Sequence, residues 1–169
     1  MRIAVSDSSC LIDLRKASLL GALLQLPYEF VIPDILFDEE LLEFASAEKE
    51  GLIRAGLRVL DLPGNGVKRA VELIGAKPKL SIHDGFAFVL AESYPGCILL
   101  TGDGELRALA DSQKIEVHGV LWVLDELHRC RLATAATLAA ALRTFAADPT
   151  VRLPYRELAA YTKRYETLK

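Results

Sequence analysis

The sequence predicts an α/β fold in which helices cover both faces of a parallel sheet. Short apolar runs typical of strands alternate with segments of helical periodicity over the first 130 residues. Residues 97–100 (Cys-Ile-Leu-Leu) are continuously apolar, as strands buried on both faces are. After residue 133 the pattern is helical only. We therefore expect a doubly wound sheet with right-handed crossovers, followed by additional C-terminal helices.

A polar turn joins the first expected strand to the first helix. Residues 3–5 are apolar, and residues 6–9 (Ser-Asp-Ser-Ser) offer side-chain oxygens that can cap a helix beginning at residue 10. A helical stretch over 18–26 then precedes a strand over 30–32. Pro33-Asp34 is typical of a helix start, and we expect this helix to continue through Phe37, Leu41 and Phe44.

The middle of the chain repeats the alternation. Glycines at 51 and 56 interrupt the helical pattern, residues 57–62 read as a strand, and loop 63–66 leads to a helix over 67–75. A strongly apolar helix over 83–93 is followed by Pro95-Gly96, which turns the chain into the buried strand 97–100. Thr101-Gly102-Asp103 ends that strand.

The last part of the chain divides into two regions. A helix over 105–112, a strand over 115–117 and a helix over 122–129 complete the alternating pattern. Helices over 134–147 and 155–165 follow, separated by Asp148-Pro149. We predict an α/β domain over 1–130 and a C-terminal helical extension over 131–169 that packs on the same domain.

Composition limits the class of protein. A chain of 169 residues that is 51% hydrophobic suits one domain with a sizeable core. No apolar stretch reaches the ~18 residues of a membrane span and no secretory leader is visible, so we expect a cytoplasmic protein without membrane contact. The three cysteines lack paired spacing, which favours free thiols. A net charge of −3 argues against strong non-specific binding to nucleic acid but does not exclude RNA as a substrate.

Four acidic residues occupy similar places along the chain. Asp7, Glu39, Asp84 and Asp103 each lie just past a strand-like run or near a helix start. Loops at the carboxyl ends of parallel strands converge, so these side chains can meet. Clustered carboxylates repel one another unless cations neutralise them, and hard oxygen ligands favour Mg²⁺ or Mn²⁺ over zinc. The pattern predicts a metal site suited to phosphoryl chemistry.

Ordinary structural roles remain open for the same acids. Asp7 and Ser9 can simply cap a helix, and Asp84 can stabilise a helix N-terminus by ~0.3–1 kcal/mol. Glu105 is equally typical of an exposed first-turn glutamate.

Four motifs together resemble those of PIN-domain ribonucleases, over about residues 2–130. They are Ser-Asp-Ser-Ser at 6–9, Ile-Pro-Asp-Ile-Leu-Phe-Asp-Glu-Glu at 32–40, Ser-Ile-His-Asp at 81–84 and Leu-Thr-Gly-Asp-Gly-Glu-Leu at 100–106. The resemblance is closest to the toxin-like branch. It implies a Rossmann-like three-layer α/β/α fold and metal-dependent endoribonuclease activity. It also implies a toxin of a toxin–antitoxin pair, with RNA as substrate, a possible antitoxin partner and a homodimeric state.

The resemblance assigns roles to individual residues. It names Asp7, Glu39, Asp84 and Asp103 as the catalytic acids. The metal ligands would be Asp7, Asp84 and Asp103, with Glu39 and Glu105 as further candidates. Ser9 and Thr101 would support the acids. Glu40 competes with Glu39 for the second acidic position. Adjacent helical residues point about 100° apart, so one of the two is expected to face the ion, and the spacing from Pro33 favours Glu39.

Two other functions remain as alternatives. A catalytically inactive PIN-like module could bind RNA or protein through the same surface, although all four acidic positions are filled. A nucleotide-binding α/β domain is disfavoured because neither GxGxxG nor GxxxxGK[ST] occurs.

Overall fold

The computed structural model describes residues 1–168, and within them the strands form one five-stranded parallel sheet in the order β3-β2-β1-β4-β5. The strands are β1 (Arg2–Ser6), β2 (Tyr28–Pro33), β3 (Arg58–Leu60), β4 (Ile98–Leu100) and β5 (Glu116–His118). The helices are α1 (Ser8–Lys16), α2 (Leu20–Leu23), α3 (Asp34–Glu39), α4 (Ser46–Arg54), α5 (Gly64–Ala76), α6 (Ile82–Glu92), α7 (Gly104–Ser112), α8 (Val120–Arg129), α9 (Ala135–Ala147) and α10 (Tyr155–Thr167).

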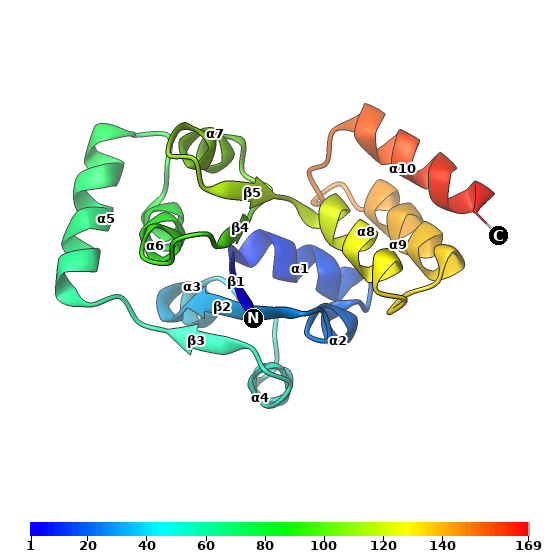
Figure 1. The fold of residues 1–169 in the computed structure, drawn as a ribbon, viewed down its shortest axis with the longest axis horizontal. Helices are drawn as coiled ribbons and strands as arrows, with labels where there is room; N and C mark the ends of the chain where they lie inside the picture. The colour runs from blue at the N-terminus through cyan, green and yellow to red at the C-terminus, as the bar shows by residue number, and fades with distance from the viewer. Residues whose placement is uncertain (169) are drawn as a thin grey trace.

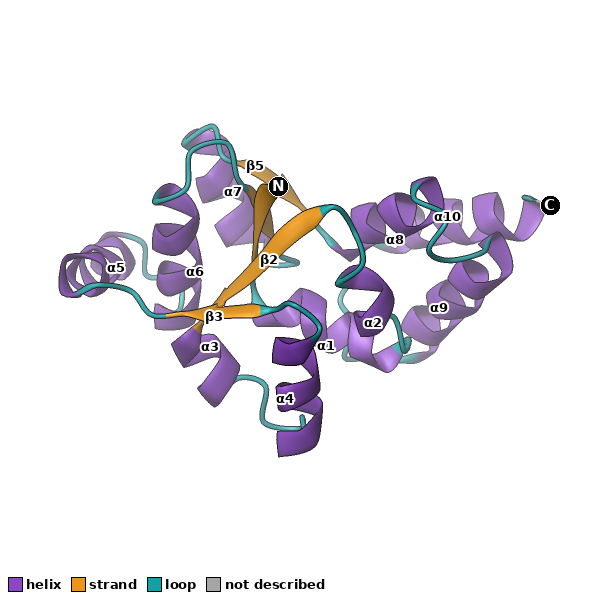
Figure 2. Cartoon of the chain, turned by 60° about the horizontal axis from the view of Figure 1, so that its bottom comes forward, coloured by secondary structure: helices purple, strands orange, loops and turns teal. Residues whose placement is uncertain are grey.

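The elements form three layers. Figure 1 shows α5 and α6 on one side of the sheet and α1 and α8 on the other, with α9 and α10 beyond α8. Figure 2 places the C-terminal helices at one end of the molecule and α5 at the opposite end. The predicted three-layer α/β fold with additional C-terminal helices is confirmed. Among the helices of residues 1–168, none has the length and apolar character needed to cross a bilayer.

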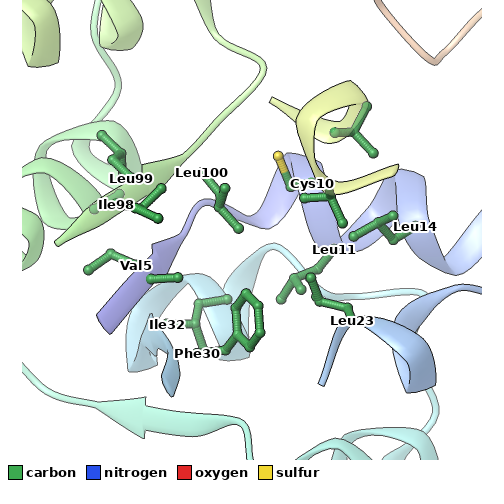
Figure 3. Close-up of a cluster of buried hydrophobic side chains, with 14 of the residues drawn as sticks. Val5, Cys10, Leu11, Leu14, Leu23, Phe30, Ile32, Ile98, Leu99 and Leu100 are labelled. Atoms are coloured by element: carbon green, nitrogen blue, oxygen red, sulfur yellow. The ribbon is translucent and has the colours of Figure 1, made fainter. Parts of the chain in front are cut away.

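The central strands and the helices on both faces share one apolar core. Val5, Ile32 and Leu99 are fully buried in the sheet. Figure 3 shows Phe30 and Ile32 directed towards Leu11 of α1, whereas Val5 and Leu99 lie on the other face of the sheet. On that other face, residues 85–91 of α6 are all buried, because this helix lies between the sheet and α5. Burying one such large apolar side chain stabilises the fold by about 1.5–3 kcal/mol, so the core fixes the strand ends firmly.

The strand order creates a switch point between β1 and β4. The chain adds β2 and β3 on one side of β1 and then returns to add β4 and β5 on the other side. Val5 pairs with Val31 of β2 and with Leu99 of β4, and the backbone N–H of Asp7 donates to the carbonyl of Leu100 at 2.8 Å. The loops after β1 and β4 therefore leave side by side, at the place where open α/β sheets bind ligands.

One region differs from the sequence prediction. The helix expected to continue through Leu41 and Phe44 ends at Glu39, and both apolar side chains instead turn into the core outside helical structure. A separate helix, α4, spans the segment that glycines were expected to interrupt, since an isolated glycine costs a helix only ~1 kcal/mol. The ion pair between Arg15 and Glu48, 2.8 Å, ties α4 to α1.

Close contact between α5 and α6 predicts a stability effect at Gly85. A Cβ atom there would lie 3.0 Å from Ile74 Cγ2 and 3.3 Å from the Ala70 carbonyl oxygen. Because the second contact is backbone, we expect Gly85→Ala to lower the free energy of unfolding by about 1–3 kcal/mol, measured by denaturant unfolding. Gly75→Ala is the matched control, since its Cβ would meet nothing within 4 Å. Equal stability of Gly85→Ala and wild type would contradict this packing.

Candidate active site

Asp7 is the centre of the site, immediately after β1. Its residue is only 5% exposed, and its Oδ2 accepts hydrogen bonds from Ser9 Oγ at 3.0 Å and Thr101 Oγ1 at 2.9 Å. Although Asp7 stands at the N-cap position of α1, its side chain makes no capping hydrogen bond. The carboxylate is thus turned towards β4 and held there by two hydroxyls, which argues against a purely capping role.

The charge of Asp7 is poorly compensated within the protein. Burial, followed by the nearby carboxylates of Glu40 and Asp84, raises its pKa to about 6, against the lowering effect of the hydrogen bonds from Thr101 and Ser9. Glu40 and Asp84 therefore lie within electrostatic reach of Asp7. A bound cation would supply the missing compensation.

The structure places Glu40, rather than Glu39, beside Asp7. Ser8 Oγ donates to Glu40 Oε1 at 2.7 Å and lies 3.4 Å from Asp7 Oδ1, so one hydroxyl links the two acids. The Glu39 side chain is 58% exposed and pairs with His83 Nε2 at 2.8 Å. The spacing from Pro33 favoured Glu39, whereas the hydrogen bonds around Asp7 favour Glu40 as the second acid. Glu40 lies just past the end of α3, which ends at Glu39.

Asp103 and Asp84 also contribute to helix starts. Asp103 Oδ1 accepts from the Leu106 N–H at 2.8 Å and caps α7, while its own N–H donates to Thr101 Oγ1 at 3.1 Å. Asp84 Oδ2 accepts from the Ser81 N–H at 2.7 Å in a capping box at the start of α6. Each acid therefore has one oxygen engaged in capping, and Thr101 connects Asp103 to Asp7.

Glu105 lies apart from the other acids. Its Oε1 is 3.5 Å from Lys79 Nζ, and it lines a separate cavity bounded by residues 76–80 and α7. The structure therefore does not bring this candidate ligand to Asp7.

A comparison with protein families decides the assignment. The family model described as PIN domain matches residues 3–166. The chain belongs to the PIN-domain family. The match includes α9 and α10, which follow the segment that carries the sequence motifs. A search of curated proteins found no match.

A cleft of about 730 Å³ lies beside the site in this PIN domain, and it is lined by Glu40 and Asp103 but not by Asp7 or Asp84. Ser9, Glu40 and Asp103 line it together with Arg15 and Lys16 of α1. Asp148, Thr150 and Arg152, from the segment between α9 and α10, form another part of its wall. The C-terminal helices therefore help to shape the cleft.

Two residues of the cleft were missed by the sequence analysis. Asp13 lies one helical turn after Ser9, so its i, i+4 spacing on α1 was a usable signal. Arg152 carried no such signal, because only the folded chain brings the α9–α10 segment to the site.

The donor chemistry suits a hard cation, but the donors do not converge. The side chains around Asp7 offer carboxylate and hydroxyl oxygens, the ligands that Mg²⁺ and Mn²⁺ prefer. Within residues 1–168, however, no three His, Cys, Asp or Glu side chains lie close enough to hold an ion. The expected preformed cluster is therefore absent from the described part of the chain, where hydroxyl and amide groups separate carboxylates that would otherwise repel.

Proposed function

We propose that this PIN domain is a Mg²⁺- or Mn²⁺-dependent endoribonuclease. The observation that carries the proposal is the buried carboxylate of Asp7, held by Ser9 and Thr101 at the switch point of the sheet and flanked by further acids. A buried carboxylate with raised pKa in a cleft is typical of functional sites. The family assignment supports nuclease chemistry, because PIN domains are generally nucleases.

Asp7, Asp84 and Asp103 are the residues we propose as metal ligands. A divalent ion at these oxygens would lower the pKa of water and offset charge on the phosphate. Arg15, Lys16 and Arg152 line the same cleft and provide positive charge for neighbouring phosphates.

We assign Glu40 the role of general base. Its Oε1 accepts a hydrogen bond from Ser8, which orients the carboxylate, and Oε2, 3.8 Å from His83 Nδ1, would take a proton from the attacking water. Attack on phosphorus then breaks the bond to the 3′-oxygen, which leaves as a hydroxyl after gaining a proton. The products carry 5′-phosphate and 3′-hydroxyl ends, as the resemblance to PIN-domain ribonucleases implies.

Metal removal tests this proposal directly. We expect wild type to bind Mn²⁺ saturably by calorimetry, to cleave a fluorescent single-stranded RNA with Mg²⁺ or Mn²⁺, and to lose cleavage in EDTA. Asp103→Asn, purified in parallel, controls for contaminating ribonuclease, because asparagine caps a helix as well as aspartate does. Absence of metal binding in well-folded wild type would contradict the proposal and favour an inactive RNA- or protein-binding module.

The resemblance also supports a role as the toxin of a toxin–antitoxin pair, acting as a homodimer in the cytoplasm. An antitoxin that places a Lys or Arg in the acidic cleft would inhibit by replacing the charge of the cation. Growth arrest on expression of wild type, but not of Asp103→Asn, would support this role, and unaffected growth would contradict it.

A further inference from the structure

A cavity of about 420 Å³, distinct from the one that Glu105 lines and termed the second cavity, opens beside Asp103. Gly102 and Gly104, on either side of that acid, both line it. Asp13, Gly102 and Arg152 line this second cavity and the acidic cleft alike. A chain-like ligand that lies across Asp103 can therefore extend from one into the other.

The wall of the second cavity is apolar and aromatic. Leu121 and Trp122 contribute from α8, and Leu153 and Tyr161 contribute from the C-terminal region. The Trp122 residue is only partly buried. Unstacked bases of single-stranded RNA bind to surfaces of this kind, which place apolar and aromatic groups beside a phosphate site.

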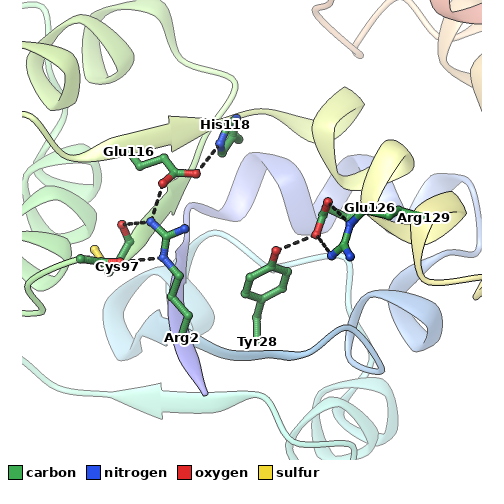
Figure 4. Close-up of polar contacts among 8 residues, drawn as sticks. Arg2, Tyr28, Cys97, Glu116, His118, Glu126 and Arg129 are labelled. Atoms are coloured by element: carbon green, nitrogen blue, oxygen red, sulfur yellow. Dashed lines mark hydrogen bonds and ion pairs between the residues drawn. The ribbon is translucent and has the colours of Figure 1, made fainter.

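The aromatic wall is held in place by a polar network. The His118 ring stacks on Trp122 with centroids 4.4 Å apart and an interplanar angle of 8°. His118 Nε2 is 2.8 Å from Glu116 Oε1, and Glu116 pairs with Arg2 at the start of β1 (Figure 4). Because residues of two strands, β1 and β5, anchor this network, the wall is preorganised for a ligand.

Asp13 supplies an acceptor to this cavity. The charge of Lys16 lowers the pKa of Asp13, but the Lys16 ammonium pairs with Asp148 at 3.4 Å. Asp13 itself makes no ion pair within residues 1–168. Burial raises the pKa of Asp13 to about 6 against the effect of Lys16, which leaves it mainly ionised at pH 7.5. A partly buried carboxylate of this kind is suited to accept N–H groups from a base.

Arg107 adds donors to the lining of the same cavity. Its Nη1 lies 3.4 Å from the Thr101 carbonyl oxygen, and a Cβ atom at residue 119 would come within 3.2 Å of it. Gly119 thus leaves room for the guanidinium in the wall of the cavity.

We propose that the second cavity binds one unstacked base of a single-stranded RNA, next to the phosphate at the acids, and that Asp13 reads this base. The proposal rests on the endoribonuclease function and names a base subsite for it. Guanine presents two adjacent N–H donors to a carboxylate and the O6 and N7 acceptors to an arginine. Uracil presents one N–H between two carbonyl oxygens, which a carboxylate repels. The cavity is therefore expected to prefer guanine to uracil.

Trp122 is the one tryptophan of the chain and reports on the cavity directly. The pentaribonucleotides UUGUU and UUUUU would be titrated in EDTA, which prevents cleavage, while tryptophan fluorescence is followed. We expect a saturable change for both and about tenfold tighter binding of UUGUU, the discrimination typical of one good base contact. Asp13→Asn should reduce this preference to about twofold, whereas Asp111→Asn, an exposed site on α7 outside both cavities, should keep it. An unresponsive Trp122, or an unchanged preference in Asp13→Asn, would overturn the proposal.

Arg152 provides a second test on an exposed side chain that does not affect folding. Phosphate contacts carry no base information. Arg152→Gln should therefore lower the binding affinity for both oligonucleotides several-fold and by a similar factor. Arg156→Gln, exposed in the first turn of α10 and outside both cavities, should bind as wild type does. Equal affinity of Arg152→Gln and wild type would overturn the path from the cleft into the cavity.

Binding in EDTA separates this inference from the proposed function. Fluorescence-detected binding without any cleavage in Mn²⁺ would retain the base subsite and refute the nuclease. Cleavage without a response of Trp122 would retain the nuclease and refute the base subsite.

Discussion

Replacing Asp7 by asparagine is expected to abolish RNA cleavage while raising the melting temperature of the metal-free protein. Asn keeps the shape of the side chain and its acceptor for Thr101, but it removes the charge. Loss of a metal-binding carboxylate should lower kcat/KM by about 10²-fold or more, because the ion and the acids act as a unit. The same change should relieve the cost of a buried charge.

The pH dependence of this stabilisation follows from the raised pKa of Asp7. In the unfolded chain the group loses its proton near 3.8, and in the folded protein near about 6. Between these values the folded state binds more protons, so stability falls as pH rises through this window. The penalty is absent below pH 3.8 and complete above about 6. Two pKa units correspond to about 3 kcal/mol.

Calorimetry in EDTA at pH 5 and pH 8 measures this effect. We expect the melting temperature of the Asp7→Asn variant to exceed that of wild type by several degrees at pH 8 and by less at pH 5. Each kcal/mol of stabilisation corresponds to about 2–4 °C. Adding Mn²⁺ should raise the melting temperature of wild type but not that of the variant. A variant less stable than wild type at pH 8, or a difference independent of pH, would contradict the account of Asp7.

Replacing Glu40 by glutamine is expected to lower cleavage by about 10²–10³-fold, whereas Glu39→Gln should stay within a few-fold of wild type. Glutamine can still accept the hydrogen bond from Ser8, so the loss would reflect the missing base. Glu39 makes an exposed pair with His83, worth about 0–1 kcal/mol at most.

The two glutamine variants are matched in chemistry and differ only in position. Initial rates on one RNA substrate, with melting temperatures measured on the same samples, compare them. A large loss of cleavage in Glu39→Gln, with Glu40→Gln still active, would contradict the role of Glu40 and support Glu39, which the spacing from Pro33 favours. Equal losses in both would show that neither acid alone acts as the base.

The sequence could predict the site residues that lie at strand ends, since strand ends follow from local apolar patterns. Asp7 and Asp103 were predictable in this sense, because each directly follows a buried strand. The sequence named Glu39 and Glu40 as alternatives but could not choose between them, because the end of α3 depends on how Leu41 and Phe44 pack in the core. The separation of the carboxylates was equally inaccessible, since it depends on hydroxyls such as Ser9 and Thr101 that meet only in the fold.

The pairing of β1 with β4 also determines when the site forms during synthesis. Asp7 is made well before its partners, because its backbone and side chain are held by Leu100 and Thr101, more than ninety positions later. The α9–α10 segment that completes the cleft emerges later still. Because a chain folds only as it leaves the ribosome, a nascent copy has no assembled site until the α9–α10 segment has been translated. The proposed nuclease activity would be withheld from a nascent chain up to that point.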